Sequence, residues 1–260
     1  MTALLEANDL RKSFGGVKAV AGISLAVPEN SIFAVIGPNG AGKSTMMNLL
    51  SGTYQPDSGT LMFGGRQLAG LPAHRRVRLG LARTFQKIRL FKQLSLLDNV
   101  LAGFHIHHRV PAWQYMLPGA AFWRDWRRCR EEGLALLEFV GLAGQATQRA
   151  GALAYGQQRM LEIARAMATR PKLFMLDEPA AGLNAAEVAF LQQRLQDIRA
   201  RGITVVVVEH NMELVMKVAD HVFVMDHGEF LFEGPPKAVQ SNPKVIEAYL
   251  GGEFDSGALA

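Results

Sequence analysis

A glycine-rich loop between an apolar run and a helical pattern constrains this chain more than any other feature. Residues 37–44, GPNGAGKS, fit the pattern G-x-x-x-x-G-K-[ST]. The continuous apolar run Ile32–Ile36 precedes the loop and predicts a buried central strand, while KSTMMNLLSG after it predicts a helix closed by Gly52. Glycines at 40 and 42 allow successive backbone N–H groups to turn inward around an anion. The pattern therefore predicts a phosphate-binding loop.

The same pattern assigns roles to individual residues and indicates ATP and Mg²⁺ as cofactors. Lys43 is expected to reach the β and γ phosphate oxygens, and the Ser44 hydroxyl to ligate Mg²⁺. A glycine-rich turn with an incidental lysine is the alternative, and the flanking strand and helix argue against it. The predicted nucleotide-binding residues of this stretch are Gly37, Pro38, Asn39, Gly40, Ala41, Gly42, Lys43, Ser44 and Thr45.

A second candidate site follows a later apolar run, LFMLDEP at 173–179. Ligands of parallel sheets bind where the strands end at their carboxyl termini, and this run ends in Asp177 and Glu178. We expect Asp177 to hold Mg²⁺ through water and Glu178 to polarise an attacking water. Taken alone, Asp-Glu after a strand would more often cap a helix, but together with the phosphate loop it favours catalysis.

The remaining pattern predicts an α/β fold with a satellite subdomain. Strand patterns occur at 4–14, 24–36, 173–176 and 203–208. A helical segment separates the last two, which is the βαβ order of a parallel sheet. HVFVMD and EFLFEG around His227-Gly228 predict a hairpin or sharp corner. From about Lys87 to Ala152 the texture is helical, and residues 103–119 have no clear period. One apolar stripe on a long helix is predicted by Phe122, Trp126, Cys129, Gly133, Leu136, Leu137 and Val140.

Composition narrows the class of protein. The apolar runs are far shorter than the roughly 20 residues of a membrane-spanning helix, the amino terminus does not resemble a secretory signal, and Cys129 is the single cysteine. These features favour the cytoplasm. The net charge of +5 would suit a polyanion, but in WRDWRRCREE the basic residues alternate with acids, so a solvated helix face is the preferred interpretation and no nucleic-acid partner is expected. HIHH at 105–108 has no acidic or cysteine companions and favours a surface segment over a metal site.

The order of the motifs resembles that of the ATP-binding subunits of ABC transporters. The phosphate loop, LAYGQQ at 153–158, LDEP and VVVVEH at 205–210 occur in the family's order and approximate spacing, from about residue 4 to residue 250. The resemblance implies a P-loop NTPase fold with a RecA-like core sheet, an antiparallel β subdomain and an inserted helical subdomain. We expect a single ATPase domain over 1–250, with the core in 1–86 and 159–235 and the helical subdomain in 87–158. A carboxyl-terminal helix and loose tail are expected in 236–260.

Three further residues match family positions. Phe14 matches the aromatic residue that stacks on adenine, where the alternative is a buried strand residue. Gln86, in RTFQ, matches the glutamine that touches Mg²⁺ and water and whose loop senses the membrane partner, although a lone Gln is normally a solvated surface residue. His210 matches the switch histidine that hydrogen-bonds the γ-phosphate, where the alternative is a structural histidine at a strand end. The resemblance thus implies that Glu178, His210, Gln86 and Lys43 are catalytic and that Ser44, Gln86 and Asp177 bind the metal.

LAYGQQ resembles the family's signature sequence, usually Leu-Ser-Gly-Gly-Gln. In that family two ATPase subunits pack head to tail, and each signature caps the γ-phosphate bound by the other subunit. A helix amino terminus suits this task because its free N–H groups attract anions. Ala154 replaces the serine and Tyr155 the first glycine, so Ala154, Gly156 and Gln157 are the predicted contacts to the partner's nucleotide. The lost hydrogen bond would cost about 1.5–3 kcal/mol, which would slow hydrolysis.

These departures are similar to those of one branch of the family. Asn184, in AAGLN, stands where most members carry aspartate, and together with LAYGQQ and the ending NPKVIEAYLG it resembles ATPases of branched-chain amino acid importers of the LivG type. The resemblance implies an identical or sibling ATPase, transmembrane permease subunits and, indirectly, a periplasmic binding protein as partners, at the cytoplasmic face of the inner membrane. Urea or amide uptake, lipid export, and a nucleotide-gated module acting on ribosomes or DNA remain the alternatives.

Overall fold

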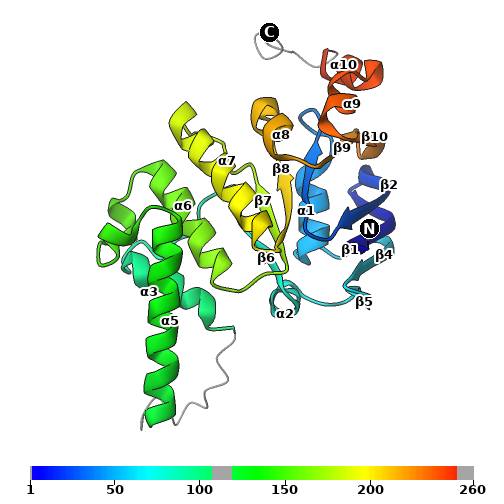
Figure 1. The fold of residues 1–260 in the computed structure, drawn as a ribbon. Coiled ribbons are helices and arrows are strands. Elements are labelled where there is room, and N and C mark those ends of the chain that lie inside the picture. Colours follow the sequence, from blue (N-terminus) through cyan, green and yellow to red (C-terminus); the bar gives the residue numbers. More distant parts are fainter. Residues whose placement is uncertain (1, 107–118, 251–260) are drawn as a thin grey trace. The chain divides into compact units, whose positions relative to one another are not determined.

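The computed structural model describes residues 2–106 and 119–250, which fall into two compact units (Figure 1). The first unit comprises residues 1–83 and 172–260, and the second comprises residues 84–171. The expected loose tail after 250 and most of the segment 103–119 lie outside the described residues.

The first unit is built around a six-stranded sheet in the order β10-β9-β3-β8-β7-β6. Strands β6, β7, β8, β3 and β9 pair in parallel, and β10 is antiparallel to β9. Because β3, β7 and β8 are buried along their whole length, their sequences are continuous apolar runs, as parallel sheets covered on both faces require. The strands are β3 Ile32–Ile36, β6 Leu81–Arg83, β7 Leu173–Asp177, β8 Thr204–Val208, β9 His221–Asp226 and β10 Glu229–Gly234.

A second, antiparallel sheet has the order β2-β1-β4-β5. The strand signal predicted at 24–36 is therefore divided between the two sheets, with β2 in this sheet and β3 in the other. Helix α1, Lys43–Ser51, packs between the two sheets, since its residues Met46 and Leu49 share one apolar cluster with β1 and β3. The strands of this sheet are β1 Ala3–Phe14, β2 Val17–Pro28, β4 Ser58–Phe63 and β5 Arg66–Gln67.

Helices α7 and α8 and the carboxyl-terminal helices complete this unit (Figure 1). Leu191, Leu195 and Ile198 form the buried side of α7, which contacts β3 and β8. The carboxyl-terminal segment contains two short helices where one was expected, because Asn242-Pro243 interrupts it. The helices are α2 Ala73–Leu79, α7 Ala185–Ala200, α8 Met212–Val218, α9 Pro236–Gln240 and α10 Pro243–Leu250.

In the described part of the second unit, three helices pack on one another: α3 Leu96–Phe104, α5 Ala120–Phe139 and α6 Tyr155–Met167. Short 3-10 turns lie at Ala143–Gln145 and Ala150–Ala152. The helical texture expected from Lys87 begins later, because no helix is formed before Ser95, whose side chain caps α3 by accepting the Asp98 N–H at 3.0 Å. Gly103 allows α3 to approach α6 closely: a Cβ there would lie 2.3 Å from the Arg165 carbonyl oxygen.

The predicted stripe on α5 is buried only in its second half. Cys129, Gly133 and Leu137 are buried, whereas Trp126 is 45% exposed. The periodicity correctly predicts one long helix, but it carries no information about where the neighbouring helices α3 and α6 end. The basic residues of α5 pair in part with acids: Arg128 contacts Asp125, and the partner of Glu132 is Arg170 at 2.6 Å.

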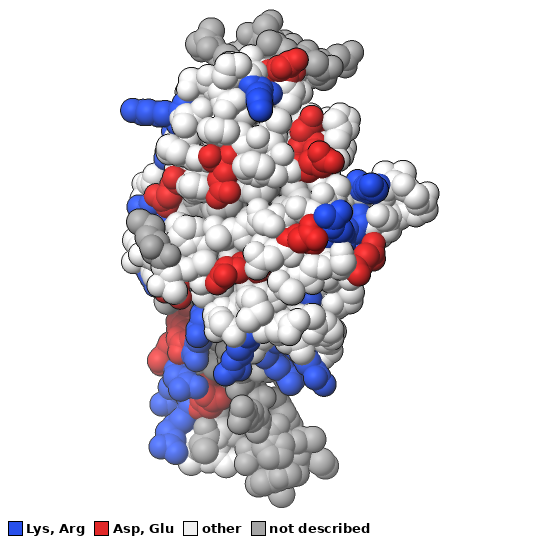
Figure 2. All heavy atoms as spheres, turned by 90° about the vertical axis from the view of Figure 1, so that its right-hand side faces the viewer, with Lys and Arg blue, Asp and Glu red and all other residues white. Residues whose placement is uncertain are grey.

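Charged groups on the antiparallel sheet are also paired, as in Arg11 with Asp9 at 2.7 Å and Lys12 with Asp57 at 2.6 Å. Figure 2 shows acidic and basic side chains together on the face that it draws. Among the described residues, none of the helices has the length and apolar character needed to cross a membrane.

Candidate functional site

The phosphate loop adopts the conformation that its glycines predict. Gly40 has φ 84° and Gly42 has φ 92°, in the left-handed region that favours glycine. Gly42 is required for space as well, since a Cβ there would lie 2.2 Å from the Ala19 carbonyl oxygen of β2. The loop therefore keeps its shape through backbone packing against the antiparallel sheet.

Lys43 lies inside the curve of this loop. Its Nζ donates to the carbonyl oxygens of Gly37 at 2.7 Å and Pro38 at 2.8 Å, and the residue is 6% exposed. Burial lowers the pKa of this ammonium, and the negative charges of Glu178 and Asp177 partly oppose that shift. The lysine, the loop and the two acids thus share one electrostatic site at the carboxyl ends of β3 and β7.

Two elements from the end of the chain support the loop, and sequence reasoning had given neither this role. The β9–β10 turn holds it from one side: Gly228 donates its N–H to the Ala41 carbonyl at 3.1 Å and accepts from the Ala21 N–H at 2.8 Å. Tyr249 of α10 reaches it from another, because its phenol interacts with the backbone N–H of Gly37. The hairpin signal at His227-Gly228 was visible in the sequence, but not what the turn contacts.

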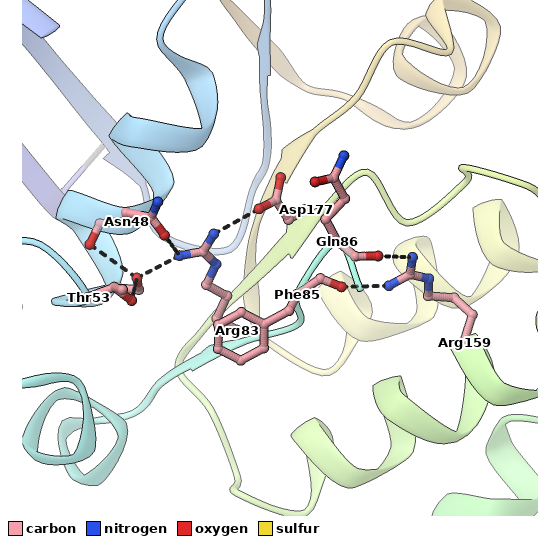
Figure 3. A network of polar contacts seen from close by, with 8 residues as sticks. Asn48, Thr53, Arg83, Phe85, Gln86, Arg159 and Asp177 are labelled. Carbon is pink, nitrogen blue, oxygen red and sulfur yellow. Dashed lines mark hydrogen bonds and ion pairs between the residues drawn. The ribbon is translucent and has the colours of Figure 1, made fainter. Parts of the chain in front are cut away.

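Asp177, at the end of β7, is held by a buried arginine that sequence reasoning missed (Figure 3). Arg83 Nη2 donates to Asp177 Oδ2 at 2.8 Å, and its Nη1 donates to Asn48 at 2.7 Å and Ser51 at 2.8 Å on α1. Both members of the ion pair are almost fully buried, with side chains 8% and 6% exposed. Arg83 thereby fixes the rotamer of Asp177 and ties the end of β7 to the helix that follows the phosphate loop.

Glu178 and His210 form a pair at the ends of β7 and β8. His210 Nε2 lies 3.2 Å from Glu178 Oε1, and both side chains are partly accessible to solvent. Glu178 has φ 46°, a left-handed conformation that is rare outside glycine, and its N–H donates to the Val208 carbonyl at 2.8 Å. Strained backbone of this kind is concentrated at functional sites. Here it turns the carboxylate toward the histidine.

Four other predicted contacts of this unit, Phe14, Asn39, Ser44 and Thr45, are at least partly accessible, whereas Gly37 and Ala41 are buried. Phe14, at the end of β1, is 43% exposed, so it is not the buried strand residue of the alternative interpretation. Its ring makes an edge contact with Tyr54 at 5.3 Å between centroids and carries Lys12 Nζ at 5.5 Å. Asn39 and Ser44 are exposed, and Thr45 is partly exposed. All of these side chains are open to a ligand.

In the helical unit, Gln86 is exposed and its backbone is held by a buried arginine of α6 (Figure 3). Arg159, which is fully buried, donates to the carbonyl oxygens of Phe85 at 2.9 Å and Gln86 at 3.0 Å. Its charge is paired with Glu162 at 2.9 Å. Burial raises the pKa of Glu162, and the Arg159 charge opposes that shift. The loop of Gln86 and the helix of LAYGQQ are therefore one packed body.

The start of α6 has the geometry expected for anion binding but lacks a side-chain cap. Ala154 occupies the N-cap position in extended conformation, and its N–H donates to Gln157 Oε1 at 3.3 Å. Ala154 and Tyr155 are exposed, Gln157 is partly exposed, and Gly156 is buried. The first turn therefore begins at two exposed residues, and the N–H groups at the start of a helix have no partner within the helix itself.

Asn184 has a local role that explains its compatibility with the fold. It is the N-cap of α7, where its side chain accepts the Glu187 N–H at 3.0 Å while Glu187 accepts the Asn184 N–H at 2.9 Å. This reciprocal capping box is equally available to asparagine and aspartate. The substitution therefore keeps the start of α7 intact.

The donor set fits Mg·ATP. Within residues 2–106 and 119–250, no cluster of three metal-binding side chains is present, and the last two residues of HIHH lie outside that range. Mg²⁺ does not need such a cluster, because it is usually held by one or two carboxylates together with waters and phosphate oxygens. In the core unit, the Ser44 hydroxyl and Asp177 supply suitable oxygens beside a loop lined with N–H groups and one ammonium.

Comparisons with known proteins match this arrangement. Residues 20–181 match the family described as ABC transporter, and residues 231–255 match the one described as branched-chain amino acid ATP-binding cassette transporter. The chain is 45% identical to the high-affinity branched-chain amino acid transport ATP-binding protein BraF of Pseudomonas aeruginosa, covering 95% of this chain and 98% of that protein. It is 40% identical, with the same coverage, to LivG of Escherichia coli, which carries the same description.

Solved structures agree. A crystal structure of an ATP-binding cassette of an ABC transporter, in its ADP conformation, has a TM-score of 0.84 and 31% identity, and the match covers 96% of this chain and 100% of that one. A nucleotide-free cassette from an ABC transporter has a TM-score of 0.83 at 30% identity, over 95% and 99% of the two chains. The expected ATP-binding fold is confirmed.

Proposed function

This chain belongs to the ABC transporter family as an ATP-binding ATPase protein, and from that premise we propose that it drives import of branched-chain amino acids. The observation that carries the proposal is the meeting of four groups in the core unit. Lys43, Asp177, Glu178 and His210 lie at the carboxyl ends of the adjacent strands β3, β7 and β8, where parallel sheets bind ligands.

In the proposed mechanism each group has one task. Lys43, already turned into the loop, attracts the phosphate oxygens, and the Gly40 and Gly42 backbone presents N–H groups to them. Ser44 and Asp177, with Gln86, would hold Mg²⁺, which neutralises charge on the phosphates. Arg83 keeps the Asp177 carboxylate oriented at 2.8 Å.

Glu178 is proposed to take the proton of the attacking water, and His210 to hold Glu178 in position and contact the γ-phosphate. Their 3.2 Å separation supports this pairing, because a general base needs a partner that fixes its orientation. Phe14 is proposed to stack on adenine, for which its exposed ring is suited.

The start of α6 is proposed to act on a nucleotide bound by a second ATPase subunit. Its exposed first residues, Ala154 and Tyr155, and the partial positive charge of the helix terminus suit a terminal phosphate. Ala154, Gly156 and Gln157 would provide the contacts. Closure of this dimer, sensed through Gln86, would move separate permease subunits from the cytoplasmic face of the membrane. A periplasmic binding protein would deliver the solute to those permease subunits from the opposite side.

The experiment that tests this assembly is light scattering on Glu178→Gln, with and without Mg·ATP. We expect ATP binding to persist, turnover to be lost and the mass to change from monomer to dimer on addition of Mg·ATP. Glu229→Gln, at an exposed position of β10, is the matched control and should keep normal turnover. Normal turnover of Glu178→Gln would remove Glu178 from the mechanism. A monomer with bound ATP would mean that an identical partner is insufficient.

The cargo is tested by reconstitution with the cognate membrane subunits and binding protein. ATP turnover should rise when leucine, isoleucine or valine is supplied with that binding protein. Stimulation by urea instead of leucine would retain the ATPase and overturn the proposed solute.

A further inference from the structure

Glu209 is a buried carboxylate directly between β8 and His210, and none of the roles above uses it. The residue is 2% exposed. Its Oε1 accepts the Ala180 N–H at 2.6 Å, and its Oε2 accepts the N–H groups of His210 at 3.1 Å and Asn211 at 3.3 Å. The side chain thus interacts with the backbone of two separate segments.

Both segments carry a proposed catalytic group. Ala180 lies two residues after Glu178 in the turn that follows β7, and His210 begins the segment that leads into α8. A second link joins the same segments at their base, where the Glu178 N–H donates to the Val208 carbonyl at 2.8 Å. The two segments are therefore connected in three ways: by the Glu209 side chain, by the backbone hydrogen bond, and by the 3.2 Å contact between the Glu178 and His210 side chains.

The chemistry of the carboxylate suits this position. An ionised carboxylate only accepts hydrogen bonds and has two oxygens, so it can bind amides from two directions at once. Burial raises the pKa of Glu209, the three backbone N–H groups oppose the shift, and the negative charge of Glu178 adds to it. Burial of the Glu209 carboxylate is unfavourable, but hydrogen bonds from the three backbone N–H groups replace those that water would make.

We propose that Glu209 is a positioning residue that holds the Glu178 and His210 segments in register, so that the base and the switch histidine meet. This inference rests on the proposed roles of Glu178 and His210. It assigns Glu209 no contact with the nucleotide.

A role for Glu209 in stability alone predicts a different result for turnover than a role in positioning Glu178 and His210. If Glu209 only stabilised the fold, its loss would act independently of His210. If it acts through the pair, its loss matters only while His210 is present, and the effects of the two substitutions are not additive. Nucleotide affinity, set mainly by the phosphate loop, should hardly change.

The test begins with Glu209→Gln, which keeps the size of the side chain but replaces one acceptor oxygen by an NH₂ donor that faces a backbone N–H. We expect turnover at saturating ATP to fall about tenfold or more, with the dissociation constant for ATP within about twofold of wild type. Glu213→Gln is the matched control, since Glu213 is an exposed acid of α8 paired with Lys217 at 2.6 Å. It should behave as wild type.

His210→Ala and the double variant complete the cycle. We expect His210→Ala alone to lose turnover, and Glu209→Gln to cost less than about twofold more in that background. Full multiplication of the two losses, wild-type turnover of Glu209→Gln, or loss of ATP binding to the same degree as turnover would each overturn the inference. Normal turnover of His210→Ala would overturn the proposed role of His210 and this inference with it.

Glu209→Asp provides a second route in case the glutamine variant does not fold. It keeps the charge but is one methylene shorter, so one carboxylate cannot reach both segments. We expect a folded protein with reduced turnover and unchanged ATP affinity. Wild-type turnover in this variant would overturn the inference by itself.

Discussion

The phosphate loop of the core unit and the start of α6 in the helical unit are both proposed to bind phosphate, but they are built differently. The loop surrounds its own cation, Lys43, and lies beside the acids Asp177 and Glu178. The start of α6 has an exposed Ala154, an exposed Tyr155 and no side-chain cap. The loop therefore has charged groups of its own unit around it, whereas the start of α6 is proposed to supply only one face of a site.

What stabilises the two sites differs in the same way. The loop is fixed by backbone neighbours, namely β2 at Ala19, the β9–β10 turn at Gly228 and α10 at Tyr249. Behind the start of α6, one buried arginine holds the arrangement through carbonyl oxygens. A site fixed by backbone packing tolerates the loss of a side chain, whereas a site fixed by a single buried charge does not.

Arg159→Met is expected to have the largest effect. The substitution leaves the Glu162 carboxylate buried without its partner and releases the carbonyls of Phe85 and Gln86. Breaking a buried ion pair in this way costs about 3–5 kcal/mol. Urea unfolding should therefore show a large loss of stability, and hydrogen exchange should increase first around residues 84–92.

The control for this prediction is Arg128→Met, on the exposed face of α5, which should change stability by less than about 1 kcal/mol. Combining Arg159→Met with Glu162→Leu should recover much of the loss because no charge then remains buried. If Arg159→Met exchanged and unfolded like wild type, the helical unit would not depend on this arginine, and the contrast drawn above would be wrong.

Lys43→Ala is expected to act on binding and not on folding. The ammonium is partly desolvated, and burial lowers its pKa, so its removal should leave the free energy of unfolding without nucleotide almost unchanged. Loss of a charge-assisted bond to phosphate costs about 1.5–3 kcal/mol, or on the order of 10- to 150-fold in ATP affinity. Calorimetric ATP titration and urea unfolding measure the two quantities separately.

Lys217→Ala is the matched control because Lys217 is an exposed lysine of α8 that forms a surface ion pair with Glu213 at 2.6 Å. It should bind ATP normally. A Lys43→Ala protein that unfolds much more readily than wild type would show that the loop depends on its lysine for structure, as the start of α6 depends on Arg159.

The loop of the core could be predicted from sequence because its determinants are local. One short stretch contains the phosphate pattern, the apolar run before it and the glycine after α1. Each of these features predicts the backbone conformation at its own position. The pattern also predicted left-handed glycines at 40 and 42. Parallel pairing of β7 and β8 followed from their continuous apolar sequences.

The supporting residues could not be predicted, since their role depends on partners far along the chain. Arg83 contacts Asp177 and Asn48, and an arginine in RTFQ gives no sequence signal of burial. Glu209 follows an apolar strand, but the sequence does not show that its carboxylate is buried against the Ala180 N–H of a distant segment. For Trp126 the prediction of burial was wrong. Helical periodicity placed this residue on an apolar face, but burial there also requires a neighbouring helix, and the residue is exposed.

Tyr249→Phe tests the support of the loop with the smallest expected effect. Burial raises the pKa of the Tyr249 phenol well above its usual value, with the Gly37 backbone hydrogen bond acting against it. The folded state therefore favours the neutral phenol. Its contribution is fully present below the unfolded pKa of about 10 and is lost as the pH rises through the higher folded value.

At pH 8 the phenylalanine variant should lose only about 0.5–1.5 kcal/mol, the usual contribution of one hydrogen bond. Above about pH 10 the wild type should lose stability more steeply than the variant, so the two unfolding midpoints converge as the phenol is forced to ionise. Urea unfolding at a series of alkaline pH values measures this, with Tyr54→Phe, at a surface tyrosine, as the control that should follow the wild type. Parallel curves for Tyr249→Phe and wild type would mean that α10 contacts the phosphate loop without stabilising it. The loop would then depend on the β9–β10 turn and β2 alone, and the contrast with the arginine-dependent start of α6 would rest on those contacts.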